Sequence, residues 1–206
     1  MPTATAPTPV PSVNDYGGFE YMRRFTLDEY HELIRVGVLT PADQVELLEG
    51  YLVLKMPRTP AHDFAIRTLN KRLTRLVPDT FTLSNQCAAT YDDSEPEPDF
   101  TIARGDERVY RARHPGSNAS SVAIEVSASS LARDRNAKAR IYARAGIPVY
   151  WVVNVVDRVI EVFTQPSGPC DAPAYAKTDT YAVGTDVPLV IDGTTVGTIA
   201  VADVMA

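Results

Sequence analysis

Apolar residues recur at helical spacing in three segments of the chain, residues 26–38, 62–77 and 131–145. Such spacing places the apolar side chains on one face and predicts three amphipathic helices. Thr26, with Glu29 three positions later, forms a capping-box pattern at the start of the first helix. Pro78 and Gly146 follow the second and third helices, at positions where helices commonly end.

Shorter runs rich in β-branched and aromatic residues lie between and after these helices. They predict strands over residues 45–48, 51–56, 81–83, 100–103, 122–126, 149–155 and 159–163. Glu49 and Gly50 form a two-residue turn between the first two strands, which predicts a β-hairpin. Polar or irregular composition predicts loops over residues 92–98, 104–119 and 165–178. Residues 179–206 suggest short strands, followed by a helical turn at 202–205.

The order of these elements predicts an α/β fold with a mixed β-sheet flanked by helices in three α/β/α layers. Residues 122–155 read as strand, helix and strand, which predicts a βαβ unit. We expect the helix at 131–145 on one face of the sheet and the two N-terminal helices on the other. Residues 1–19 are rich in Pro, Thr and Ala and predict a disordered tail. Residues 20–206 are expected to form a single domain.

The chain of 206 residues carries a formal net charge of −6, which argues mildly against a dominant nucleic-acid surface. Basic residues nevertheless gather in segments 67–75 and 133–144, for which a solvated helix face is the ordinary alternative. No apolar run is long enough to span a membrane and the first residues do not resemble a signal peptide, so we expect a cytoplasmic protein. Cys87 and Cys170 are expected to be free thiols.

Two carboxylates and a lysine stand out against this background. Glu125 interrupts the apolar strand at 122–126, and Asp99 follows Pro98 at the start of another strand. Lys138 lies on the third helix. Because a buried carboxylate is unfavourable without a partner, these acids are candidates for holding Mg²⁺. A lysine beside them could orient a water or offset charge that builds on phosphorus, so the trio suits metal-assisted phosphodiester hydrolysis.

Each candidate residue, taken alone, also has an ordinary structural explanation. Glu125 could pair with an arginine or lie at an exposed strand end, and Asp99 could be an exposed turn carboxylate. Lys138 could belong to a solvated helix face. Glu46, which precedes the hairpin turn, could face water, and His62 could be a surface histidine at a helix N-terminus. The combination and its order along the chain therefore carry the functional hypothesis.

Taken together, these residues resemble the PD-(D/E)XK restriction-endonuclease-like superfamily and, more closely, the Uma-type family of bacterial endonucleases. The matching stretches are residues 25–30, 45–50, 62, 97–99, 124–126, 134–138, 142–148 and 150–151. The resemblance implies the restriction-endonuclease-like fold and DNA as the substrate. It also implies an assembly in which two active sites cut two strands, so we expect a homodimer.

The resemblance further implies roles for individual residues. Asp99 and Glu125 would bind Mg²⁺ or Mn²⁺ together with the Val126 carbonyl. Glu46 would bind the metal through water or hold a second ion. Lys138 would position the attacking water, and His62 would contact a phosphate.

Three departures from the family pattern qualify this assignment. Ser127 stands where the superfamily usually has its lysine, so the resemblance implies that the lysine has moved to the helix as Lys138. The Ser-Pro pair that usually follows the glutamate is absent, and the hairpin turns on Glu49 and Gly50 instead of Asp-Gly. Tyr142, one turn after Lys138 on the same face, could hydrogen-bond within the site, but core packing is the more ordinary explanation for it. A catalytically inactive binding protein and a hydrolase of small phosphoesters remain the alternative functions.

Overall fold

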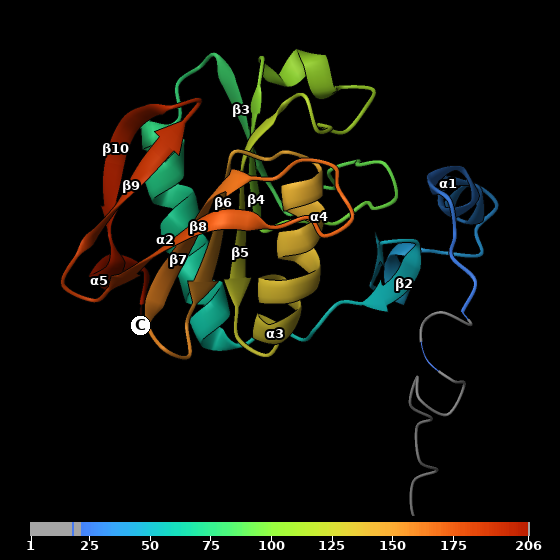
Figure 1. The fold of residues 1–206 in the computed structure, drawn as a ribbon, viewed down its shortest axis with the longest axis horizontal. Helices are drawn as coiled ribbons and strands as arrows, with labels where there is room; N and C mark the ends of the chain where they lie inside the picture. Colours follow the sequence, from blue (N-terminus) through green and yellow to red (C-terminus); the bar gives the residue numbers. More distant parts are fainter. Residues whose placement is uncertain (1–17, 19–21, 206) are drawn as a thin grey trace, which may run out of the picture.

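The computed structural model describes residues 18 and 22–205, so the predicted tail at 1–19 lies outside the described residues except for residue 18. The centre of the fold is a six-stranded mixed sheet with the strand order β3-β4-β5-β6-β7-β8 (Figure 1). Its strands are β3 (Phe81–Asn85), β4 (Phe100–Arg104), β5 (Ser120–Ser127), β6 (Val149–Asn154), β7 (Val159–Pro166) and β8 (Tyr175–Ala182).

The βαβ unit predicted from the sequence is present. Strands β5 and β6 pair in parallel, with Glu125 opposite Val152, and the third predicted helix connects them. Every other neighbouring pair in the six-stranded sheet is antiparallel. All residues of β5 and β6 are buried, as expected for strands covered on both faces.

Helix α2 (Pro60–Leu76) covers one face of the sheet. The Thr59 side chain caps its N-terminus by accepting a hydrogen bond from the backbone of His62. Its buried stripe includes Leu69 and Leu73 and joins a core that contains Ile124 of β5. Burying such a stripe removes apolar surface from water and is the main term that holds the helix in place.

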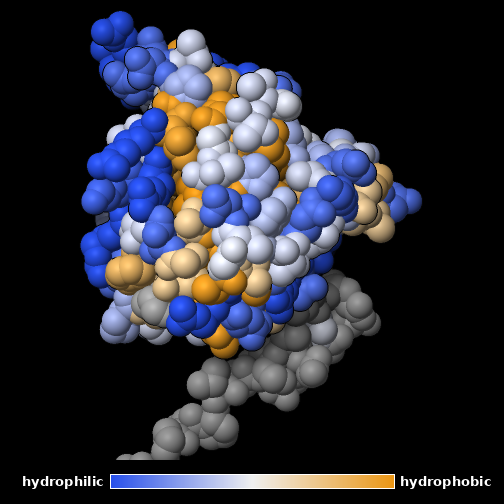
Figure 2. All heavy atoms as spheres, turned by 90° about the vertical axis from the view of Figure 1, so that its left-hand side faces the viewer, coloured by the Kyte–Doolittle hydropathy of each residue, from blue (hydrophilic) through white to orange (hydrophobic). Residues whose placement is uncertain are grey.

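A small outer layer packs against α2. It consists of the hairpin β9 (Asp186–Ile191) and β10 (Thr194–Ala200), followed by α5 (Val201–Val204). Gly197 permits the close approach, because a Cβ atom there would come within 2.5 Å of the Leu76 side chain. Figure 2 shows the face on this side, where apolar residues form a central band between hydrophilic ones.

A helical segment made of α3 (Leu131–Arg133), η5 (Asp134–Lys138) and α4 (Ala139–Arg144) covers the opposite face. Tyr142 of α4 packs against Tyr150 of β6, with 4.8 Å between the ring centroids. Two helical layers thus enclose the sheet, which confirms the predicted α/β/α architecture. Strand β8, which begins at Tyr175, extends into residues that the sequence predicted to be irregular. Its edge position allows mostly exposed, polar side chains, which weakens the strand signal.

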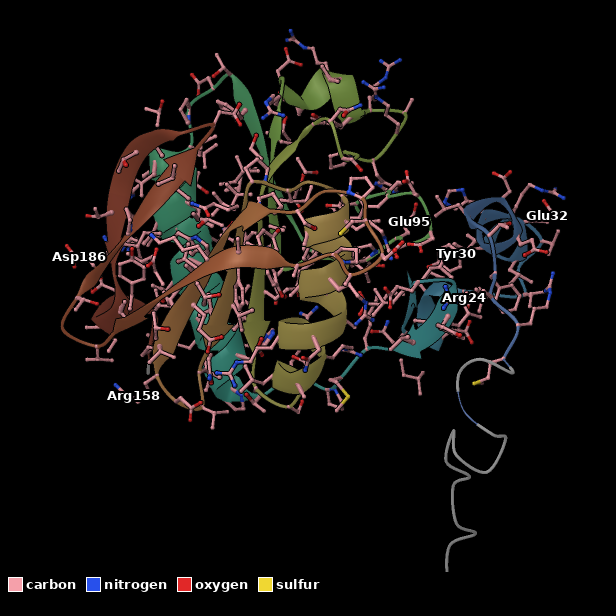
Figure 3. The ribbon with its side chains drawn as sticks, viewed as in Figure 1. Arg24, Tyr30, Glu32, Glu95, Arg158 and Asp186 are labelled. Carbon is pink, nitrogen blue, oxygen red and sulfur yellow. The ribbon has the colours of Figure 1, made fainter. Side chains whose placement is uncertain are left out.

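The placement predicted for the first helix is wrong. Helix α1 (Leu27–Arg35) does not accompany α2 but lies with the hairpin β1 (Val45–Leu48) and β2 (Tyr51–Leu54) beyond α4 (Figure 1). The loop before β4 holds it there, because the His31 imidazole lies 2.9 Å from the Glu95 carboxylate. Figure 3 labels Tyr30 and Glu95 at this junction. A short amphipathic helix can use any apolar surface, so its periodicity does not specify which face it covers.

The end of the first helix and one predicted loop also differ from the prediction. Helix α1 ends at Arg35, three residues before the predicted end, and Gly37 adopts a φ of 77° in the turn that follows. Residues Glu107–Tyr110 form a short 3₁₀ helix, η4, inside a predicted loop. The predicted hairpin turn is present, with Glu49 and Gly50 both at positive φ, as a type I′ turn requires.

Candidate active site

Two neighbouring strands bring Asp99 and Glu125 to the same place. Phe100 pairs with Ile124 in the antiparallel register of β4 and β5, so the preceding Asp99 lies beside Glu125. The Val126 N–H donates a 2.8 Å hydrogen bond to Oδ2 of Asp99. Both carboxylates are buried, with exposed fractions of 8% for Asp99 and 4% for Glu125. Neither the exposed turn nor the exposed strand end considered from the sequence applies.

Lys138 reaches the same point from the helical segment above the sheet. Its Nζ lies 2.9 Å from Oε1 of Glu125 and 3.2 Å from Oε2 of Glu46. The lysine is buried, so the solvated helix face considered from the sequence is wrong for this residue. An ammonium group buried between two carboxylates is stabilised by their charges, whereas any member left alone there would be strongly destabilising.

Glu46 belongs to the hairpin strand β1 and faces this site rather than water. Its side chain is buried, and its Oε2 accepts a 3.2 Å hydrogen bond from the Glu97 N–H. Arg133 lies at the edge of the same group, with Nη2 4.0 Å from Oε1 of Glu46. The hairpin therefore adds a third carboxylate to the site, from a segment far away in the sequence.

His62 enters the site at the N-terminal end of α2. Its Nε2 lies 3.5 Å from Oδ2 of Asp99, and most of the side chain is buried. Burial by itself would lower the pKa of His62, but the neighbouring Asp99 carboxylate raises it above its ordinary value of 6.5. Burial would in turn raise the pKa of Asp99, and hydrogen bonds from His62 and the Val126 N–H lower it overall. The two groups thus favour a charged pair.

The charges around Glu125 and Lys138 shift both of their pKa values. Burial raises the pKa of Glu125 to about 8 against the opposing effect of the Lys138 charge, and nearby Asp134, Asp99 and Glu46 add to the rise. Burial would lower the pKa of Lys138, but the carboxylates of Glu125, Glu46 and Asp134 raise it well above its ordinary value. Lys138 therefore stays an ammonium group, and the metal-free site holds more negative charge than one lysine can neutralise.

The structure adds Gln86 to the site and gives Tyr142 a defined contact in it. Gln86 donates a 3.2 Å hydrogen bond to Oδ1 of Asp99, and nothing in the sequence around Gln86 indicates this. Tyr142 donates a 2.7 Å hydrogen bond to Oε1 of Glu125, so it is more than the core residue that was expected. Its position one helical turn after Lys138 was the signal for this role.

The residues of the site other than Tyr142 line a cleft with a volume of about 650 Å³. The cations at its wall are Lys55, Arg58 and Arg133. Lys55 is paired with Glu97 at 2.6 Å, and Arg133 donates to the Leu54 carbonyl. Buried carboxylates at the base with cations at the rim suit a ligand that is itself anionic and that approaches a cation held by the acids.

The donor atoms at the base of the cleft suit a hard divalent cation, since the candidate ligands are carboxylate oxygens. Within the described residues no hydrogen bond reaches Oε2 of Glu125, which leaves that oxygen for a ligand. Those residues include no group of three or more His, Cys, Asp or Glu side chains that could hold a metal ion. Because Mg²⁺ keeps several waters and needs only one or two protein carboxylates, Asp99 and Glu125 fit it without a third side chain.

Comparison with known proteins identifies the family and the fold. The model of the Uma2 family, described as "Putative restriction endonuclease", matches residues 27–193. The chain belongs to this family. Its fold is similar to the crystal structure of a "putative nuclease belonging to DUF820" from Anabaena variabilis, with a TM-score of 0.65 and 14% sequence identity. The likeness covers 87% of this chain and 97% of the other. None of the curated proteins matches the sequence.

Family membership and the shared fold confirm the recognition made from the sequence stretches. The position at which the superfamily usually has its lysine is occupied by Ser127, which is buried and donates a 2.7 Å hydrogen bond to Asp134. The cation beside Glu125 is the ammonium group of Lys138. In addition, no helix in the described part of the chain has the length and apolar character needed to cross a membrane.

Proposed function

We propose that the chain is a Mg²⁺- or Mn²⁺-dependent endonuclease that hydrolyses phosphodiester bonds in DNA. The observation that carries this proposal is the buried contact of the Lys138 ammonium with Glu125, beside Asp99 and at the base of an open cleft. Membership of the Uma2 family supports it. The lysine and the two carboxylates come from three separate segments of the chain, and buried charged groups that gather in a cleft are characteristic of functional sites.

Asp99 and Glu125 would hold the metal ion, with the Val126 carbonyl as a further oxygen ligand. Glu46 would contact it through water or hold a second ion. The bound metal would act as a Lewis acid on a phosphoryl oxygen and lower the pKa of a water molecule. Asp99 is already oriented for such a role, because Gln86 and the Val126 N–H fix both of its oxygens.

The remaining groups of the site would act on the water and the phosphate. Lys138 is held as an ammonium group, so it can orient the attacking water and stabilise the negative charge that grows on the phosphate oxygens. His62, on the other side of Asp99, would contact a phosphate. Arg58 and Arg133 at the wall of the cleft would contact backbone phosphates on either side of the cleaved bond.

One observation favours a second candidate function, a catalytically inactive binding protein with the same fold. Lys138 contacts Glu125 and Glu46 directly, so its ammonium group offsets part of their negative charge without a metal ion. In an inactive protein this arrangement would be purely structural. The two candidates differ in whether Mn²⁺ binds at Asp99 and Glu125.

The proposal is tested with supercoiled plasmid DNA, incubated with purified protein in Mg²⁺, Mn²⁺, Ca²⁺ or EDTA. We expect nicked and linear products with Mg²⁺ or Mn²⁺ and none with EDTA. The Asp99→Asn variant should be inactive, whereas Asp192→Asn should cleave like the wild type, since Asp192 pairs with Arg104 at the far end of β4. Equal cleavage by all three proteins would indicate a contaminant and exclude the proposal. Faster hydrolysis of nitrophenyl phosphates than of DNA would favour a small-phosphoester hydrolase.

A further inference from the structure

The helical segment that carries Lys138 contains a π turn, η5, between α3 and α4. Here the Ala139 N–H donates to the carbonyl of Asp134, five residues earlier, as well as to that of Asn136. π turns are rare in proteins and often lie at functional sites. This π turn begins at Asp134 and ends at Lys138, and both of these residues are buried.

Side chains outside the helical ladder stabilise the π turn. The Tyr150 hydroxyl donates a 3.0 Å hydrogen bond to the Asp134 carbonyl. The Asn136 amide donates a 2.6 Å hydrogen bond to the Ala132 carbonyl. A turn that disturbs the regular ladder is thus compensated by two side-chain donors, which favours one defined backbone conformation.

Asp134 and Lys138 stand at the two ends of the π turn, and both are buried, with exposed fractions of 1% and 4%. The turn therefore presents a carboxylate and a lysine together on the buried side of the helical segment.

Asp134 and Lys138 form two successive contacts between the helical segment and strand β5. Oδ2 of Asp134 accepts hydrogen bonds from Ser127 at 2.7 Å and from Ser130 at 2.5 Å. Lys138 contacts Glu125, two residues before Ser127 on the same face of the strand. Two strand residues advance about 6.7 Å and four helical residues about 6 Å, so the two contacts match in spacing.

We propose that Asp134 is a positioning residue that, by holding Ser127 and Ser130, fixes the π turn and thereby aims the Lys138 ammonium at Glu125. This inference rests on the proposed function for its catalytic consequence. Ser127 occupies the strand position where the superfamily usually has its lysine. In this chain the strand position anchors the helix instead, and the helix supplies the cation.

A second feature of Asp134 supports a role beyond the hydrogen bonds to the two serines. Its other oxygen, Oδ1, is buried and has no hydrogen-bond partner within the described residues. A residue that served only to bind the two serines would not require a second buried oxygen without a hydrogen-bond partner. The Asp134 side chain also contributes, after Glu125 and Glu46, to the rise in the pKa of Lys138 and so helps to keep this lysine charged.

The first test observes Lys138 directly, without any assay of activity. A buried ammonium group held by carboxylates exchanges slowly with water and gives its own ¹H–¹⁵N signal, which Lys138→Arg removes and so identifies. We expect Asp134→Ala to broaden or abolish this signal and Ser130→Ala to weaken it. Ile199→Val, which alters the core behind the opposite face, should leave the signal unchanged. A sharp, unshifted Lys138 signal in folded Asp134→Ala protein would overturn the inference.

If Asp134→Ala does not fold, Ser127→Ala replaces it in both tests, because it removes one of the two hydrogen bonds to Asp134 and leaves the carboxylate in place. The second test measures cleavage kinetics for Asp134→Ala, for Lys138→Ala and for the double variant. Misplacing the lysine should lower kcat by about 10- to 100-fold with little change in KM. In the Lys138→Ala background Asp134→Ala should have almost no further effect, since the group that it positions is gone. Multiplicative losses in the double variant would overturn the inference.

Failure of the proposed function gives a different pattern. A wild-type protein that binds no Mn²⁺ and cleaves no DNA would refute the endonuclease proposal. The ammonium signal would still decide whether Asp134 positions Lys138, because that measurement needs neither metal nor substrate.

Discussion

The Nζ atom of Lys138 lies 2.9 Å from Oε1 of Glu125, and both charged residues are buried. The lysine comes from the π turn and the glutamate from the central strand β5. The same oxygen accepts a hydrogen bond from Tyr142. Glu125 is therefore held by two donors from one helix, on the side away from its free oxygen. This relationship suggests how a strand carboxylate can be fixed in place and still have an oxygen available for a ligand.

The carboxylates and the lysine should respond differently when metal binding is measured. Asp99→Ala and Glu125→Ala each remove a proposed ligand, so we expect at least a tenfold weaker affinity for Mn²⁺ by isothermal titration calorimetry, about 1.4 kcal/mol. Lys138→Ala removes a nearby positive charge, so the affinity should be unchanged or slightly higher. DNA cleavage should be abolished or severely reduced in all three variants. A loss of affinity in Lys138→Ala as large as that in Asp99→Ala would contradict the roles assigned to these residues.

The Tyr142 hydroxyl should matter for activity and not only for stability. Tyr142→Phe keeps the ring and removes one donor to Glu125, so we expect the free energy of unfolding in urea to fall by about 1 kcal/mol and cleavage to slow. Tyr175→Phe is the matched control, because it also removes one hydroxyl, which donates to the Ile147 carbonyl away from the cleft. Equal slowing of cleavage in both variants would show that the effect arises from packing or stability alone.

Glu49 should make stability depend on pH in the acidic range. It accepts hydrogen bonds from Arg140 and Arg144 of α4, and chiefly the Arg140 contact lowers its pKa below the ordinary 4.5. Because the folded-state pKa is depressed, this stabilisation is complete above about pH 4.5 and is lost as the pH falls through the lower, folded-state value. Glu49→Gln should therefore be less stable than wild type by about 1 kcal/mol at pH 7.

Chemical unfolding between pH 7 and pH 3 measures this effect. The difference in unfolding free energy between wild type and Glu49→Gln should shrink toward zero at the acidic end. Since the Glu49 contacts join the hairpin that carries Glu46 to the helix that carries Lys138, cleavage should also decrease in the variant. A stability difference that stays constant from pH 7 to pH 3 would rule out the ion pairs as its cause.

The assembly expected for duplex cleavage is a homodimer, because two strands require two active sites and C₂ pairing is the commonest symmetry. Sedimentation velocity at micromolar concentration should show a species of twice the chain mass, 22.5 kDa for one chain. A monomer under these conditions would contradict the prediction, and linear products would then have to arise from two separate nicks.

Part of the site could be recognised from local sequence alone. Glu125 interrupts a run of residues that is otherwise apolar, and this anomaly pointed correctly to a buried carboxylate with a partner. The type of that partner was not determined, because an arginine or a lysine would satisfy the same charge. Gln86 gave no signal at all, since a glutamine after an edge strand is usual at the surface and only its contact with Asp99 makes it part of the site.

The sequence by itself determined the order and type of most elements, the family, and the three residues Asp99, Glu125 and Lys138 as a group. It did so because hydrophobic periodicity and short motifs are properties of neighbouring residues. Only the tertiary structure decided that Glu46 contacts Lys138, that α1 lies beyond α4, and that Asp134 accepts a hydrogen bond from Ser127. Those features depend on which segments pack together, and packing is set by the shapes and charges of surfaces that are far apart in the chain.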